Sequence, residues 1–245
     1  MKVLHDWIVP DWPAPPRVKS LITTRLGGVS KGPYASFNLG PHTGDDPAAV
    51  AANRRRLREL LPAEPKWLDQ VHGSQVAAAD DLDGTGAADA SFTRNTGTVC
   101  AVMIADCLPV LLCDRDGGAA GIAHAGWRGL AAGVIENTVR AMEIPAGRLL
   151  AYLGPAIGPA AFEVGAEVRD AFMNHDAAAA AAFAPSADGK WCADLYMLAR
   201  QRLARVGVTQ IHGGGLCTAG DPARFYSHRR DRVTGRMAAL IWLAA

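Results

Sequence analysis

The chain has 245 residues, of which 49% are hydrophobic and 20% are charged, so general disorder is excluded and one domain with a substantial core is expected over residues 1–245. A net charge of +1 gives no electrostatic basis for binding nucleic acid or an anionic membrane, and no apolar run is long enough for a transmembrane helix. The first sixteen residues hold four prolines and several charges instead of a signal peptide, and the five cysteines form no Cys-x-x-Cys pair. We therefore expect a cytoplasmic protein with reduced thiols.

Two elements are expected in the first quarter of the chain. Residues 18–23 have the character of a strand. Asp46 and Pro47 are typical of the N-cap and first position of a helix, which we expect to run to about Leu61. Because no aromatic residues interleave with the arginines on its polar side, we interpret them as a solvated face instead of a nucleic-acid contact. They are Arg54, Arg55, Arg56 and Arg58.

The rest of the chain alternates clustered strands with helices. Strands are expected at 98–105, 110–113, 119–123, 149–153 and 238–243, and helices at 130–142, 163–175 and 194–206, the last ended by Gly207. Six consecutive alanines at 177–182 indicate a surface helix end or an insertion. This order favours mixed α+β layers over strict βαβ alternation, and the glycine motifs of dinucleotide and P-loop folds are absent from the sequence.

Three short segments carry a soft-metal ligand beside glycine or proline: Gln70-Val71-His72-Gly73, Ala105-Asp106-Cys107-Leu108-Pro109 and His124-Ala125-Gly126-Trp127-Arg128-Gly129. Each ligand follows a predicted strand, so a rigid scaffold would aim it into a cleft. Two imidazoles and one thiolate make a three-ligand zinc set with a fourth position open, which points to catalysis because structural zinc sites have four protein ligands. Two other readings stay open: Cys107 as a nucleophile with a histidine base, or a buried cysteine with unrelated histidines.

A second group of candidates is cationic and lies in loops. Arg25 stands just before Gly27 and Gly28, and residues 226–231 place hydroxyl, imidazole and guanidinium donors together. Such donors suit phosphate, so we expect Arg25, Ser227, His228 and Arg229 to bind phosphate or substrate. The alternative is that the arginines form ordinary surface ion pairs. Two carboxylates are candidates to move protons in a deaminase: Asp106 immediately precedes Cys107, and Glu163 opens an expected helix after Gly158-Pro159. Neither lies in the pattern of the cytidine-type deaminases.

Taken together, the segments resemble the YfiH-type family, also called the laccase-domain or multicopper polyphenol oxidase family. The resemblance covers about residues 20–243 and shows no departure at the defining positions. Besides the three ligand segments, it rests on Thr23-Thr24-Arg25-x-Gly-Gly-Val-Ser, Asn38-Leu39-Gly40, Gly44-Asp45-Asp46-Pro47, Asn53-Arg54, Ala88-Asp89-Ala90, Gly154-Pro155-Ala156-Ile157-Gly158, Cys217-Thr218 and Phe225-Tyr226-Ser227-His228-Arg229.

The resemblance implies a four-layer α/β/β/α sandwich with mixed sheets, similar to the cytotoxic necrotizing factor catalytic domain. It implies that His72, Cys107 and His124 bind one zinc, with copper as the older description of the family. It also implies a purine nucleoside phosphorylase acting on adenosine, inosine, guanosine and methylthioadenosine, with adenosine deaminase activity. The expected partners are then a purine nucleoside and phosphate, and no obligate protein partner is evident.

The residues rank the remaining activities. A multicopper oxidase holds its coppers largely with His-x-His pairs, and the seven histidines here form none, so a polyphenol oxidase is the weakest interpretation. The alternative from a different class is a cysteine amidohydrolase that edits peptidoglycan precursors, with Cys107 as nucleophile and His124 as base. It predicts a covalent acyl-enzyme and an activity that survives chelation.

Overall fold

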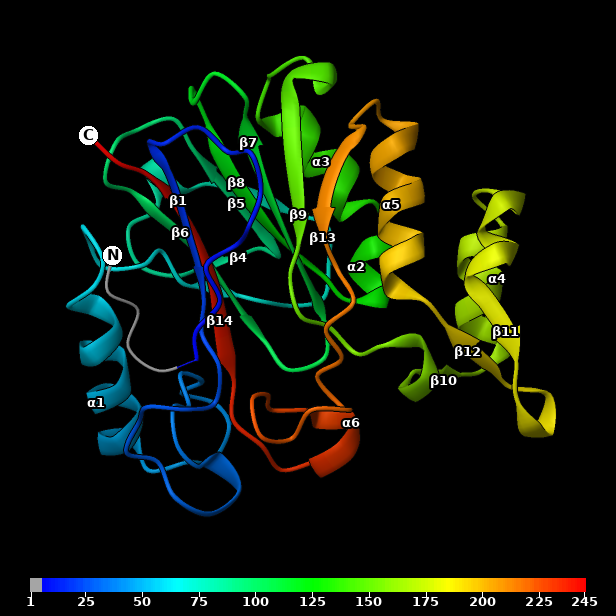
Figure 1. The fold of residues 1–245 in the computed structure, drawn as a ribbon, viewed down its shortest axis with the longest axis horizontal. Coiled ribbons are helices and arrows are strands. Elements are labelled where there is room, and N and C mark those ends of the chain that lie inside the picture. The colour runs from blue at the N-terminus through cyan, green and yellow to red at the C-terminus, as the bar shows by residue number, and fades with distance from the viewer. Residues whose placement is uncertain (1–5) are drawn as a thin grey trace.

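The computed structural model describes residues 6–245 and contains two sheets that pack face to face (Figure 1). The smaller sheet is antiparallel, with the order β1-β14-β6, and comprises β1 (Val18–Ile22), β14 (Met237–Leu243) and β6 (Val99–Ile104). The larger sheet has the order β13-β9-β7-β8-β5-β3 and is parallel only in its outermost pairs. Its strands are β3 (Val76–Ala78), β5 (Ala90–Thr93), β7 (Leu108–Asp114), β8 (Ala120–Ala125), β9 (Leu149–Leu153) and β13 (Gln210–Gly213). The expected mixed α+β class is confirmed.

Strand β6 is buried on both faces, which explains its unbroken apolar sequence. Cys100, Val102 and Ile104 belong to the core between the sheets, whereas alternate residues such as Ala101 face a second core under α1 (Pro47–Arg58). The α1 helix begins as predicted, because the Asp46 carboxylate accepts a hydrogen bond from the Ala48 amide at 2.9 Å.

The prediction of a solvated arginine face on α1 is wrong for Arg54. Its guanidinium stacks on Trp67, with 4.3 Å from Cζ to the ring centroid, and its Nε donates to the Leu39 carbonyl at 2.9 Å. Burial lowers the pKa of Arg54, and Glu64 acts in the opposite direction. This side chain is therefore half-buried against Trp67 and not fully solvated.

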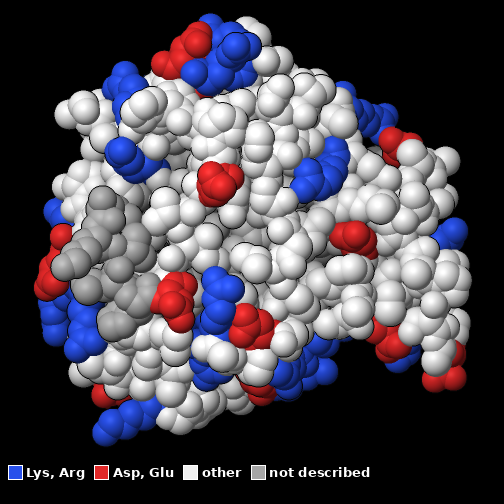
Figure 2. Space-filling view, viewed as in Figure 1, with Lys and Arg blue, Asp and Glu red and all other residues white. Residues whose placement is uncertain are grey.

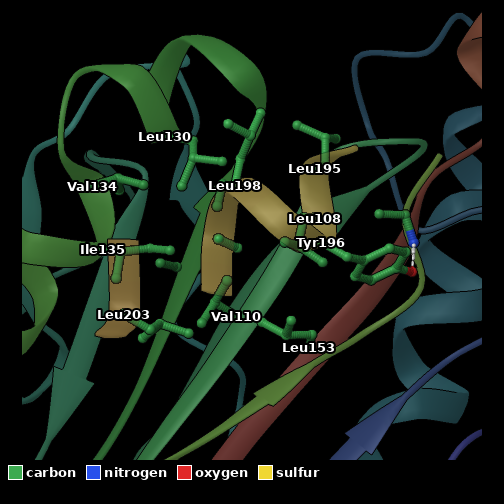
Figure 3. Close-up of a cluster of buried hydrophobic side chains, with 14 of the residues drawn as sticks. Leu108, Val110, Leu130, Val134, Ile135, Leu153, Leu195, Tyr196, Leu198 and Leu203 are labelled. Atoms are coloured by element: carbon green, nitrogen blue, oxygen red, sulfur yellow. Dashed lines mark hydrogen bonds between the residues drawn. The ribbon is translucent and has the colours of Figure 1, made fainter. Parts of the chain in front are cut away.

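The open face of the larger sheet is covered by α2 (Trp127–Ala131), α3 (Val134–Ala141) and α5 (Leu195–Arg205) (Figure 3). Leu108 and Val110 of β7 pack there against Leu198 and Leu203 of α5. The helix predicted at 130–142 is in fact divided between α2 and α3, because Gly133 has a φ of 89° that a helix cannot accommodate.

Residues 163–193 form a small separate lobe of the fold (Figure 1). The helix predicted at 163–175 is wrong at its start, because Glu163 and Val164 pair with Cys192 and Trp191. The lobe holds β10 (Glu163–Val164), α4 (Ala166–Met173), the 3-10 helix η5 (Ala177–Ala182), β11 (Phe183–Pro185) and β12 (Trp191–Ala193). The remaining elements are β2 (Leu68–Asp69), β4 (Gly86–Ala87), α6 (His228–Asp231) and the 3-10 helices η1 (Gly32–Tyr34), η2 (Ala79–Asp81), η3 (Ala146–Arg148), η4 (Pro159–Ala161) and η6 (Ala187–Gly189).

The surface shows little separation of charge on the face in Figure 2, where basic and acidic side chains are interspersed around a broad uncharged centre. This distribution fits the net charge of +1. Among residues 6–245, none of the helices combines the length and the apolar character needed to cross a bilayer.

Candidate active site

A cavity of about 540 Å³ opens where β6, β7 and β8 meet the loops before β14 and α6. Its wall combines candidate metal ligands, apolar side chains and three arginines. The lining residues are His42, Asp69, Gln70, His72, Met103, Ala105, Asp106, Cys107, His124, Arg128, Ile157, Phe162, His228, Arg229 and Arg236. Both the volume and this mixture are typical of a site for a polar small molecule.

The structure brings His72, Cys107 and His124 together, with their ligand atoms all within 4.8 Å of one another. Cys107 lies where the chain passes from β6 in one sheet to β7 in the other, and His72 lies in the turn after β2. His124 was expected just beyond a strand but lies inside β8, opposite Pro109 of β7. Three segments that are 35 and 17 residues apart in sequence thus meet because two sheets pack against each other.

The buried carboxylate of Asp89 fixes two of these three residues. Its Oδ1 accepts hydrogen bonds from His124 Nδ1 at 2.8 Å and from the His72 amide at 3.0 Å. Its Oδ2 accepts from the Gly73 amide at 2.6 Å. An ionised carboxylate can only accept, so His124 carries its proton on Nδ1 and leaves Nε2 free as a ligand atom. The turn holding His72, with a φ of 60°, is tied to the same carboxylate.

The cluster is strongly polarised. Burial opposes ionisation of the Cys107 thiol, but the His124 and His72 rings outweigh it and lower its pKa to about 6. Burial likewise opposes protonation of His124, but Cys107 and Asp89 raise its pKa to about 9. Burial alone would raise the pKa of Asp89, and the hydrogen bonds from His124, Gly73 and His72 lower it instead. The thiolate, which is the form that binds metal, is therefore favoured at neutral pH.

The space around the cluster suits a bound metal ion. A Cβ on Gly126 would lie 2.7 Å from Cys107 Sγ and 3.5 Å from His72 Cδ2, so only glycine leaves the thiolate accessible at this position. A Cβ on Gly129 would lie 2.7 Å from the Gly73 carbonyl, so α2 packs directly on the turn that carries His72. A His₂Cys set of this kind fits zinc with one coordination position left for another ligand.

The four residues expected to bind phosphate are placed differently from one another. His228 and Arg229 line the cavity, whereas Arg25 and Ser227 are not among its lining residues. Arg25 donates from Nε to the Ala35 carbonyl at 2.9 Å and from Nη1 to the Pro222 carbonyl at 3.0 Å. Ser227 is buried and caps α6, accepting a hydrogen bond from the Arg230 amide.

Asp106 joins the thiol loop to α6. Its Oδ2 accepts from the Arg229 amide and its Oδ1 from the Thr218 hydroxyl, both at 2.6 Å. Its own φ of 90° is a conformation that non-glycine residues rarely adopt. Asp106, which is next to Cys107 in sequence, therefore links the loop that carries the thiol to α6, which carries His228 and Arg229. The other candidate carboxylate, Glu163, pairs with Lys190 at 2.8 Å and is not among the lining residues.

Sequence reasoning missed several residues of the cavity, among them His42, Asp69 and Arg236. Asp89 was noted only as part of a motif, although it is the residue that orients both histidines. The signal for Asp89 was its place in an Ala-Asp-Ala segment before a strand, where a buried acid requires a partner.

Comparisons with known proteins agree with this geometry. Residues 19–244 match the family described as "Multi-copper polyphenol oxidoreductase laccase". The chain belongs to this family. It is 57% identical over 241 residues to "Purine nucleoside phosphorylase PA4543" of Pseudomonas aeruginosa, covering 98% of this chain and 99% of the relative. It is 56% identical over 239 residues to "Purine nucleoside phosphorylase YfiH" of Escherichia coli, covering 96% and 98%.

Solved structures of the laccase-domain family show the same fold. Protein NMB0706 of Neisseria meningitidis superposes with a TM-score of 0.95 at 52% identity, covering 98% of this chain and all of that one. YlmD of Geobacillus stearothermophilus superposes with a TM-score of 0.89 at 32% identity, covering 100% and 98%. The arrangement of sheets that builds the cavity is therefore common to relatives that share a third of the sequence.

Proposed function

We propose that the protein is a zinc-dependent purine nucleoside phosphorylase acting on adenosine, inosine, guanosine and methylthioadenosine, with adenosine deaminase activity. The observation that carries this proposal is one cavity in which a His-Cys-His cluster faces three arginines. The names of close relatives support the phosphorylase. The substrate range, the deaminase activity and a cytoplasmic location go beyond those names and are part of what we propose.

The metal would be held by His72, Cys107 and His124. When bound, zinc supplies a Lewis acid that polarises an oxygen or nitrogen atom of the substrate. The donor set also accepts copper, but a single His₂Cys site cannot perform the four-electron chemistry of a multicopper oxidase. Asp89 orients His124 for this role through the 2.8 Å hydrogen bond to Nδ1.

Phosphorolysis requires a phosphate oxygen to attack C1′ of the ribose while the bond from C1′ to purine N9 breaks. The purine leaves with the bonding electron pair and takes up a proton. His228 and Arg229 line the side of the cavity where an oxyanion would bind, and Ser227 and Arg25 support that wall from behind. Ile157 and Phe162 supply the apolar surface of the cavity for a purine ring.

A product assay on metal-analysed protein tests the proposal. Adenosine, inosine, guanosine and methylthioadenosine are each incubated with and without phosphate. The free bases, the sugar 1-phosphates and, for adenosine, inosine and ammonia are quantified. Adenine and ribose 1-phosphate formed only with phosphate are the expected result, and inosine in both buffers would add the deaminase. Zinc that is stoichiometric while all four nucleosides stay intact would contradict the proposal.

A second candidate function is favoured by the chain of contacts from Cys107 through His124 to Asp89. A thiolate, an imidazolium and a buried carboxylate in this order can also perform amide hydrolysis. The thiolate attacks as nucleophile, the imidazolium gives its proton to the leaving amine and then acts as base for the attacking water, and the carboxylate orients the ring. The protein would then be a cysteine amidohydrolase that edits peptidoglycan precursors. Activity on a muropeptide that survives chelation, with an acyl adduct on Cys107 in the mass spectrum, would establish it instead.

A further inference from the structure

The protein holds the side chain of Arg236, which lines the cavity, by a single nitrogen of its guanidinium. Arg236 stands just before β14 and lines the cavity together with the His-Cys-His cluster. Its Nη1 donates to the carbonyls of Thr234 and Gly235 at 3.3 and 3.1 Å, and none of the ion pairs among residues 6–245 includes it. One edge of its guanidinium is anchored, and the other hydrogen-bond donors are free for a ligand.

The other arginines near the cavity differ from Arg236 in how they are held. Arg229 donates from Nη1 to the Glu163 carbonyl at 2.7 Å and stacks on Phe162, with 5.3 Å from Cζ to the ring centroid. Arg128 is exposed and lies over Trp127. Arg25 is bonded to two carbonyls outside the cavity lining. Arg236 is therefore a half-buried guanidinium with free donors in the cavity wall, whereas Arg128 is exposed and Arg229 is bonded to Glu163.

The segment Asn38-Leu39-Gly40, which has no chemistry of its own, supports Arg236. Asn38 Oδ1 accepts from the Arg236 amide at 2.8 Å, and the Leu39 amide donates to the Arg236 carbonyl at 3.0 Å. A Cβ on Gly40 would lie 2.7 Å from Arg236 Cγ, so the side chain passes directly over this glycine. Asn38 is itself held by Asp45, at 3.0 Å from Nδ2. This buried polar framework fixes where Arg236 points.

The positive charge of Arg236 has no counter-ion of its own in the wall of the cavity. Burial lowers its pKa, while Cys107 and Asp106 act in the opposite direction. Both of those partners have other commitments, because Asp106 accepts from Arg229 and Thr218, and Cys107 would share its charge with the metal. A cation removed from water without its own counter-ion costs free energy, which an anionic ligand would offset.

We propose that Arg236 is the main anchor for the phosphate co-substrate, presenting its free edge to two phosphate oxygens beside the metal cluster. This inference rests on the proposed function, because it takes phosphate to be the anion that enters the cavity. A planar guanidinium held at one edge matches the geometry of a phosphate better than a flexible ammonium does. His42, beside it in the wall, adds a second donor.

The test compares Arg236→Gln, Arg236→Lys and Gly40→Ala with the matched control Arg55→Gln, which changes an exposed arginine of α1. KM for phosphate and KM for adenosine are measured separately in phosphorolysis. Inorganic phosphate is also titrated into each protein by calorimetry, and thermal unfolding verifies that each variant is folded. In Arg236→Gln we expect KM for phosphate to rise at least about tenfold while KM for adenosine stays within about twofold, since charge-assisted hydrogen bonds are lost.

Two further comparisons sharpen the result. Arg236→Lys should recover only part of the affinity. Gly40→Ala retains the arginine but should weaken phosphate binding, because the added Cβ would displace the Arg236 side chain. If KM for phosphate is the same in Arg236→Gln as in Arg55→Gln, the proposal is overturned. If the wild-type protein performs no phosphorolysis, the proposed function fails, and the calorimetric titration decides this inference by itself. Phosphate binding that is lost in Arg236→Gln would then support an anion site at Arg236, and equal binding would overturn it.

Discussion

The two walls of the cavity are built on different principles. The wall with the His-Cys-His cluster is carried mainly by β6, β7 and β8, whose backbone ladders and apolar side chains fix Cys107 and His124. The turn of His72 after β2 is tied to this wall by Asp89. The wall with Arg236 and His228 is carried by loops and the four-residue helix α6. Buried polar side chains, chiefly those of Asn38, Asn53 and Asp106, hold these loops in place.

The comparison teaches where precision and adaptability reside in this molecule. Reactive groups need fixed geometry, which the sheets and the buried carboxylate of Asp89 supply here. A binding wall made of loops depends on every member of its hydrogen-bond network, because one lost partner leaves others buried and unsatisfied. Substitutions in the wall that carries the His-Cys-His cluster (the sheet wall) should therefore affect the reaction. Substitutions in the wall that carries Arg236 and His228 (the loop wall) should affect the stability of the protein and its affinity for substrate.

The largest effect is expected from Cys107→Ala, which removes the ligand that joins the two sheets at the site. We expect phosphorolysis to fall to the background rate and zinc to be lost from the purified protein, because two histidines alone form an incomplete site. Elemental analysis and the product assay measure both. Cys192→Ala, which changes a half-buried cysteine outside the cavity lining, is the control. If the Cys107→Ala protein is active, the complete His-Cys-His cluster is not needed for the reaction.

Asn53→Ala tests the loop wall. The buried amide of Asn53 donates from Nδ2 to the carbonyls of Asn38 and Ser36 at 3.0 and 3.2 Å, and its Oδ1 accepts from the Val29 amide at 3.0 Å. Its removal leaves several buried polar groups without partners, so the free energy of unfolding should fall by about 2–4 kcal/mol. Urea unfolding measures the change. Asn174→Ala, at an exposed position after α4, should stay within about 0.5 kcal/mol of the wild type.

Asp89→Asn probes the support behind the sheet wall with a smaller change. The amide cannot accept at both former oxygens, so His124 or the turn of His72 loses a hydrogen bond. Zinc affinity should fall by about 10- to 100-fold, as for other carboxylates that orient a ligating histidine. Competition with a chromophoric chelator measures it, with Asp116→Asn at an exposed turn as the control. Equal affinity in the two variants would show that Asp89 has only a structural role.

The smallest effect concerns the titration of His42. Partial burial, together with Arg236 and Arg54, lowers its pKa below 6.5, while Asp69 acts in the opposite direction. A lowered pKa means that His42 is mostly neutral at pH 6.5, where an unperturbed histidine is half protonated. NMR titration should show this, and Arg236→Gln should move the midpoint upward. If the midpoint does not change in that variant, His42 and Arg236 lie too far apart to form one continuous loop wall.

Much of the fold could be predicted where the signals are local. Asp194 accepts a hydrogen bond from the Met197 amide and Gly207 has a φ of 88°, so the helix expected at 194–206 is present as α5. Local signals failed where pairing is long-range. Glu163 joins a strand because Cys192 lies beside it, and nothing near Glu163 in sequence indicates that partner. The break between α2 and α3 was missed for a different reason: its signal is local, but the single glycine Gly133 in an apolar run was not enough to predict the end of a helix.

The candidate site divides in the same way. His72, Cys107 and His124 were recognisable because soft-metal ligands beside glycine or proline after a strand are uncommon. Their mutual distance and the role of Asp89 follow only from the packing of two sheets. Arg236 was missed because it lies at the cavity only as a result of the pairing of β14 with β1 and β6. No local sequence pattern indicates this pairing.

The position of β14 has a consequence for how the cavity is completed. Strand β14 follows all the other described strands in sequence yet occupies the middle of the smaller sheet, and the residue just before it is Arg236. A chain that lacks this strand has β1 and β6 separated by a gap, and its cavity lacks one wall. The cavity is therefore complete only when β14 has paired with both neighbours. A truncated chain supplemented in trans with a peptide of residues 232–245 would make turnover itself a readout of strand insertion.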